Sequence, residues 1–141
     1  MRVSHMSLAL LLLSALCGCG GGDGLQKFPT VPVKGTVKLK GGAPLTKGLV
    51  QFQGGGVTGS GSLNDKGEYT IQIINGQAGL PPGTYDVALL NTAEGSAYPD
   101  ASSLKPVIDA KYAGTDTSGL QAIVSGKEGT FDFEVEPFAA K

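Results

Sequence analysis

The sequence predicts an all-β protein that folds as a single β-sandwich of about seven strands. From Val31 onward, short stretches alternate apolar and polar residues with a period of two, as half-buried strands do. Glycine and proline, with 23 and 8 copies among 141 residues, cluster between these stretches and mark turns. No segment after residue 18 shows the period of a helix. Short strands joined by such turns are typical of a sandwich.

Residues 1–18 are predicted to be an export signal that is removed from the mature protein. Arg2 supplies a positive start, and the apolar stretch at residues 6–16 follows it. A helix of that length spans about 16 Å, whereas a bilayer core requires about 20 apolar residues. The stretch therefore matches the hydrophobic part of a signal peptide and not a transmembrane helix.

Two cysteines end this segment, and their neighbours distinguish them. Cys17 follows the bulky Leu16, whereas Cys19 follows Gly18 and has Leu16 three positions upstream. The second arrangement resembles the lipobox of bacterial lipoproteins. The resemblance implies cleavage before Cys19, a diacylglycerol on its sulfur and acylation of the new amine, and several acyl chains anchor stably. The alternative is an ordinary secretory signal whose cysteines are incidental.

The composition of residues 19–141 excludes several kinds of chemistry. They contain ten lysines and twelve acidic residues but no histidine, arginine or tryptophan. Histidine is the commonest general base and metal ligand, and zinc sites require clusters of cysteine or histidine. The lysines are scattered and offset by acids, which does not suit nucleic acid. We therefore expect no enzyme, cofactor, metal site or nucleic-acid partner, and no disulfide, because Cys19 is the only cysteine left.

The first half of the mature chain begins with a tether and three strands. Residues 19–30, the lipidated cysteine and a glycine-rich stretch, form a flexible tether with a reach on the order of 20 Å. The first strand covers residues 31–40, and Val50 and Phe52 mark the second. A weaker alternation at residues 57–63 predicts the third. It ends in a hairpin loop in which Gly67 supplies the positive φ.

The second half contains four further strands and a short edge strand. Tyr69, Ile71 and Ile73 predict one strand, and a Leu-Pro-Pro-Gly turn leads into another that contains Tyr85. The irregular segment at residues 91–116 contains a short edge strand at 107–108. Strands at 120–124 and 130–136 close the sandwich. The residues predicted to face the core are Val33, Val37, Val50, Phe52, Tyr69, Ile71, Tyr85, Val87, Phe131 and Phe133.

Several turn motifs point to one family. They are Val-Lys-Gly-Thr-Val at 33–37 with Gly-Ala-Pro-Leu at 42–45, Asn-Asp-Lys-Gly-Glu-Tyr at 64–69, Pro-Gly-Thr-Tyr-Asp-Val at 82–87, and segments at 108–112, 117–120 and 131–133. Together they resemble carboxypeptidase regulatory-like domains of small bacterial lipoproteins, over residues 31–137, with 138–141 as a tail. The resemblance implies a transthyretin-like or immunoglobulin-like sandwich. It implies no activity, because one fold serves many functions.

Two features near the turns have structural alternatives to a binding role. Asn64, Asp65 and Glu68 offer oxygen ligands for calcium, but calcium prefers six or more oxygens. The same residue types favour turns through side-chain bonds to nearby backbone, so we expect no metal here. Tyr85 is predicted to donate its hydroxyl to nearby backbone in the manner of a tyrosine corner.

Two surfaces are candidates for contact with a partner. Long loops on rigid scaffolds often bind ligands, which makes Tyr98, Lys111 and Tyr112 candidate binding residues. The alternative for Tyr112 is that its ring caps one end of the sandwich. The other candidate is an acidic stripe on the last strand, matched by a basic row on the first. These residues are Asp132, Glu134 and Glu136, and Lys34, Lys38 and Lys40.

The function expected from these observations is that of a non-enzymatic, lipid-anchored lipoprotein of the bacterial cell envelope. Its sandwich would serve protein–protein or structural contacts, with a carbohydrate- or small-ligand-binding module as the alternative. The protein is expected to be exported and held by its lipid at the periplasmic face of the outer membrane or at the cell surface. The partner, an envelope protein or a glycan, and the oligomeric state are not specified by the sequence.

Overall fold

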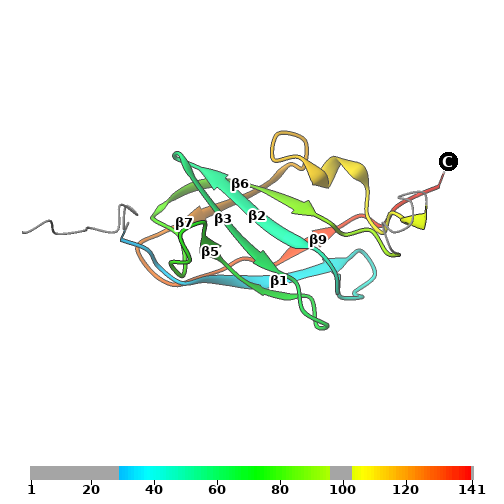
Figure 1. Ribbon diagram of the computed structural model, residues 1–141, viewed down its shortest axis with the longest axis horizontal. Coiled ribbons are helices and arrows are strands. Elements are labelled where there is room, and N and C mark those ends of the chain that lie inside the picture. Colours follow the sequence, from blue (N-terminus) through cyan, green and yellow to red (C-terminus); the bar gives the residue numbers. More distant parts are fainter. Residues whose placement is uncertain (1–28, 96–102, 141) are drawn as a thin grey trace, which may run out of the picture.

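A computed structural model describes residues 29–95 and 103–140 (Figure 1). Two β-sheets pack face to face with the core between them, so the protein is an all-β sandwich, as predicted. The predicted signal peptide, Cys19, most of the predicted tether and Tyr98 lie outside the described residues.

The smaller sheet is built around β1. This strand pairs with β4 in antiparallel fashion on one side and with β8 and β9 in parallel on the other. The larger sheet is antiparallel and has the strand order β5-β3-β2-β6-β7. The bounds are β1 Val33–Leu39, β2 Leu49–Gly54, β3 Val57–Ser62, β4 Glu68–Thr70, β5 Gln72–Ile73, β6 Gly83–Leu90, β7 Leu120–Val124, β8 Gly129–Thr130 and β9 Phe133–Val135. A 3-10 helix, η2 (Ala110–Ala113), lies between β6 and β7.

The core follows the predicted alternation. Eight of the ten residues predicted to face it are buried, and Phe131 and Phe133 are only partly buried, although both pack against it. Phe52 is 0% exposed and lies at the centre of an aromatic cluster. Its ring centroid is 6.1–6.4 Å from the rings of Tyr69, Tyr85, Phe131 and Phe133.

Two predicted strands are each divided in the structure. The segment from Tyr69 to Ile73 leaves the smaller sheet after β4 and joins the larger one as β5. The loop before it is therefore not a hairpin within one sheet, although Asn64 N donates to Glu68 O over 3.0 Å and Gly67 has the expected φ of 75°. The last predicted strand is divided into β8 and β9, although both keep one register with β1.

The chain enters the sandwich at one end, which we call the tether end. Val31 forms a β-bridge with Leu80, and Thr30 Oγ1 donates to Ala78 O over 2.8 Å. The β2–β3 turn and the β7–β8 turn lie at this end, whereas η2 and the C-terminus lie at the opposite, far end (Figure 1).

Candidate functional site

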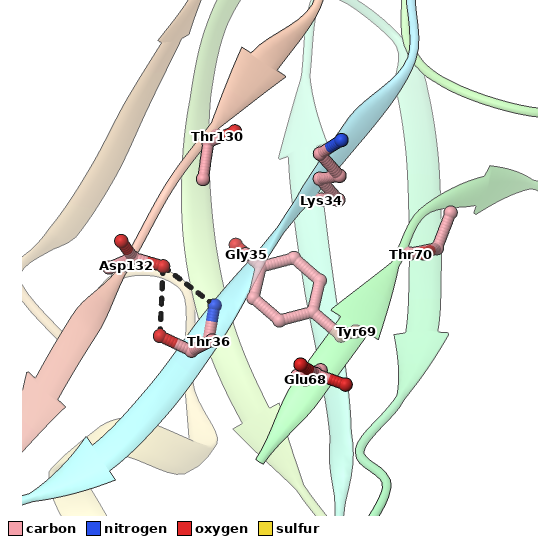
Figure 2. A pocket seen from close by; sticks show the side chains of 8 residues that line it. All are labelled: Lys34, Gly35, Thr36, Glu68, Tyr69, Thr70, Thr130 and Asp132. Carbon is pink, nitrogen blue, oxygen red and sulfur yellow. Dashed lines mark hydrogen bonds between the residues drawn. The ribbon is translucent and has the colours of Figure 1, made fainter. Parts of the chain in front are cut away.

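A polar junction lies where β1 meets the C-terminal strands. Asp132 Oδ1 accepts hydrogen bonds from Thr36 N at 2.9 Å and Thr36 Oγ1 at 2.8 Å (Figure 2). The Tyr69 hydroxyl donates to Phe131 O over 2.6 Å. In an uninterrupted parallel ladder, Thr36 N would donate to Phe131 O. Both groups are instead satisfied by side chains, which explains the gap between β8 and β9.

Gly35 makes this junction sterically feasible. A Cβ on Gly35 would lie 1.8 Å from Phe131 O and 2.8 Å from the Tyr69 hydroxyl oxygen. Beside this junction, a hollow of about 380 Å³ lies on the outer face of the smaller sheet (Figure 2). We call it the Gly35 hollow. Its lining residues are Lys34, Gly35, Thr36, Glu68, Tyr69, Thr70, Thr130 and Asp132.

The charged groups around the Gly35 hollow already have partners within the chain. Lys34 forms an ion pair with Glu128, and Glu68 accepts a hydrogen bond from Asn64 Nδ2 at 2.9 Å. Burial raises the pKa of the Tyr69 hydroxyl, so it stays a neutral donor. The hollow therefore offers hydrogen bonds to a small polar molecule, without an activated nucleophile.

The predicted acidic stripe and basic row lie next to each other and compensate one another. Lys38 and Glu134 are register partners on β1 and β9, and Lys40 Nζ lies 2.7 Å from Glu136 Oε1. Lys111 Nζ lies 2.9 Å from the other oxygen, Glu136 Oε2. Hydrogen bonds from Lys111 and Lys40 lower the pKa of Glu136 to about 2. The smaller sheet thus presents paired charges and not two separate charged surfaces.

Lys111 and Tyr112, which were predicted to bind a partner, make their contacts within the protein. Tyr112 is 4% exposed, and its hydroxyl oxygen accepts a hydrogen bond from Glu136 N at 3.1 Å. Lys111 Nζ, which also forms the ion pair with Glu136, lies 4.9 Å from the centre of the Tyr112 ring. This geometry favours the alternative in which Tyr112 caps one end of the sandwich. Tyr98 lies outside the described residues.

The turn residues also follow their structural alternatives. Asn64 Oδ1 accepts hydrogen bonds from Lys66 N at 2.9 Å and Glu68 N at 3.0 Å, which commits this oxygen to the turn. The Tyr85 hydroxyl donates to Pro81 O over 2.9 Å, which confirms the predicted backbone bond. Within residues 29–95 and 103–140, no cluster of three or more His, Cys, Asp or Glu side chains is placed to hold a metal ion.

The sequence interpretation did not identify the junction of Thr36, Tyr69 and Asp132 as a unit. One signal was present, because a glycine inside a strand often marks a close backbone approach, and Gly35 is such a glycine. The partner of that approach is 96 residues away in the sequence and is not specified by any local pattern.

No protein-family model matches this chain, and no curated protein matches it. Among the described residues, no helix has the length and apolar character needed to cross a membrane. The resemblance to carboxypeptidase regulatory-like domains therefore rests on the turn motifs alone.

Proposed function

We propose that the protein is a lipid-anchored protein of the bacterial cell envelope whose sandwich makes non-enzymatic contacts with another envelope protein. Cys19, preceded by Gly18 and with Leu16 three positions upstream, is the residue that would receive the lipid. Membership of the carboxypeptidase regulatory-like family is part of the proposal. It is supported by the positive φ of Gly67 and the Tyr85–Pro81 bond, since both lie within the turn motifs.

The point at which the chain enters the sandwich carries this proposal. Val31 and Leu80 exchange backbone hydrogen bonds of 2.9 and 3.0 Å at the tether end. If residues 19–30 form the flexible tether expected from the sequence, its reach would be on the order of 20 Å, and a lipid on Cys19 would hold the tether end beside the membrane. The far end would then face away from the membrane, toward other envelope components.

The far end contains an apolar side chain suited to protein contact. Phe138 is 46% exposed, and its backbone N donates to Val107 O over 2.8 Å, which fixes the segment to the body. Lys111 and Glu136 lie on neighbouring parts of the same end. An aromatic anchor surrounded by polar groups is the usual composition of an energetic hot spot. We infer that the partner covers Phe138.

Composition supports the non-enzymatic part of the proposal. Residues 19–141 contain no histidine or arginine, and Glu128, Asp132 and Glu136, which lie beside β1, each contact a lysine or a backbone N–H. Perturbed acid–base pairs are the usual sign of catalytic carboxylates. The described carboxylate with the lowered pKa, Glu136, owes it to two lysines and would stay ionised near neutral pH.

The anchor is tested by substituting each cysteine separately. Cys19→Ala should abolish metabolic labelling with palmitate and release the protein from the membrane fraction. Cys17→Ala is the matched control, and it should leave labelling and fractionation unchanged because Cys17 leaves with the signal. Full membrane association of the Cys19→Ala protein would contradict the proposal.

The contact is tested by placing a photo-crosslinking amino acid at Phe138 in the lipidated protein in intact cells. We expect a discrete crosslinked protein band from position 138. Ser125, exposed at the tether end, is the control position and should give no such band. The same band from both positions would mean that the far end is not the contact surface.

A further inference from the structure

The two outer faces of the sandwich differ sharply in charge. The strands of the smaller sheet contain Lys34, Lys38, Glu68 and Glu134, whereas the five strands of the larger sheet contain one charged residue, Asp86. The surfaces of soluble protein domains usually carry about 25–35% charged residues. The uncharged polar residues facing outward on the larger sheet, which we call the neutral face, are Gln51, Gln53, Thr58, Ser60, Ser62, Gln72, Thr84 and Gln121.

The register of the strands arranges these side chains in rows. One row runs across β3, β2, β6 and β7, and its members are Thr58, Gln53, Asp86 and Gln121. A second row runs across β5, β3 and β2, and its members are Gln72, Ser60 and Gln51. Neighbouring strands lie about 4.8 Å apart, so the amides and hydroxyls of each row, with the Asp86 carboxylate, lie side by side. Each amide or hydroxyl can both donate and accept.

A hollow of about 260 Å³ lies at the border of the neutral face. Its lining includes Asp86, Asp116 and Gln121, together with Thr115 and Leu120. Gln121 Nε2 donates to Asp86 Oδ1 over 2.9 Å, which holds two of these groups in place. Ile123, 72% exposed, follows on the same side of β7 and adds an apolar surface beside the polar groups.

The charge pattern of this surface selects among partners. The carboxylates of Asp86 and Asp116 would repel anionic polymers and anionic lipid, and no lysine of the five strands offsets them. Protein interfaces are enriched in aromatic residues, methionine and arginine and depleted in serine. The outward positions of these strands hold none of the enriched types. A neutral carbohydrate matches better, because its hydroxyls pair with amides and carboxylates and its C–H groups pack on apolar side chains.

We propose that the neutral face binds a neutral polysaccharide, with one sugar unit seated in the hollow of Asp86, Thr115, Asp116 and Gln121. In this arrangement the carboxylates accept hydrogen bonds from sugar hydroxyls, and the Gln53 and Gln121 amides both donate and accept. Ile123, on the same side of β7 as Gln121, contacts the apolar side of a sugar ring. This site is separate from the far-end contact proposed above, and binding here does not require the lipid anchor.

The test is native affinity electrophoresis of the mature, lipidated protein in a non-glycosidic detergent. The gels contain dextran, laminarin or mannan, with alginate as the anionic comparison. We expect at least one neutral polysaccharide to retard the protein, and alginate to have no effect. Gln53→Ala and Gln121→Ala should each raise the dissociation constant about tenfold, the factor for one lost hydrogen bond.

The matched control is Glu134→Gln, an exposed position on the opposite sheet, which should bind like the native protein. Thermal melting of each variant shows whether it is folded. The proposal is overturned if none of the three neutral polysaccharides retards the protein, or if both glutamine variants retain native affinity. It is also overturned if sedimentation shows self-association that Gln53→Ala abolishes, because the face would then bind a second copy of the chain.

Discussion

At the scale of single residues, the absence of one Cβ determines how β1 meets the C-terminal strands. In Gly35→Ala the new methyl carbon would lie 1.8 Å from Phe131 O, so the backbone has to move apart. We expect a loss of about 1–3 kcal/mol or more in the free energy of unfolding, measured by urea denaturation. Gly126→Ala is the control, because its Cβ would meet nothing within 4 Å, and it should change stability by less than about 0.5 kcal/mol.

Glu136 contributes to the acid stability of the protein. Its pKa is about 2 in the folded protein, because Lys111 and Lys40 donate to it, and about 4.3 in an unfolded chain. A lowered folded pKa contributes stability that is present above about pH 4.3 and is lost as the pH falls toward 2. Glu136→Gln should therefore flatten the decline of the urea midpoint between pH 5 and 2. Equal slopes of the urea midpoint against pH for the two proteins would contradict this assignment. So would a difference between the slopes that 1 M salt leaves unchanged, because salt screens exposed ion pairs.

At the scale of elements, the sequence pattern predicts burial better than pairing. Tyr69 and Ile71 face the core as predicted, yet the chain changes sheets between β4 and β5. The alternation of apolar and polar residues cannot reveal this change of sheet, because the same residues face inward in either sheet. The break between β8 and β9 is equally hidden, since it depends on Asp132 replacing a backbone partner of Thr36 across 96 positions of sequence.

In the candidate sites too, contacts between residues close in sequence were predictable and contacts between distant strands were not. The Tyr85–Pro81 bond and the turn role of Asn64 were predictable because their partners lie within four residues. The Gly35 hollow and the neutral face were not, because they depend on the register of strands far apart in sequence. Lys111 and Tyr112 were selected for their residue types, but their partners, such as Glu136, come from the C-terminal segment.

The aromatic cluster predicts unequal roles for the phenylalanines of different strands. Phe52 on β2 is fully buried among four rings, whereas Phe131 and Phe133 are partly exposed. Phe52→Ala should lower the free energy of unfolding by about 3–5 kcal/mol, and Phe131→Ala by clearly less. Urea denaturation of both variants, with Phe52→Leu as a milder change at the same site, measures the difference. A larger loss for Phe131→Ala would mean that the cluster is not centred on Phe52.

At the scale of the whole molecule, the sandwich separates three surfaces with different chemistry. The smaller sheet carries lysines and acids that neutralise one another, the larger sheet is nearly uncharged, and the far end exposes Phe138. The proposed tether at the opposite end would leave all three accessible. A protein held in this way could contact a glycan with its side and a protein partner with its end at the same time.

This arrangement requires a defined orientation, which bilayer quenching can measure. Strand β6 has eight residues, so the tether end and the far end are about 26 Å apart at roughly 3.3 Å per residue. A fluorophore on Ser125→Cys, at the tether end, should therefore be quenched more strongly by headgroup-labelled lipid than one on Lys66→Cys, in the turn at the far end. Both positions are exposed, and the native Cys19 would be blocked by its lipid. Equal quenching would mean that the sandwich turns freely on its tether, and stronger quenching at position 66 would mean that the far end rests on the membrane and is not free to meet a partner.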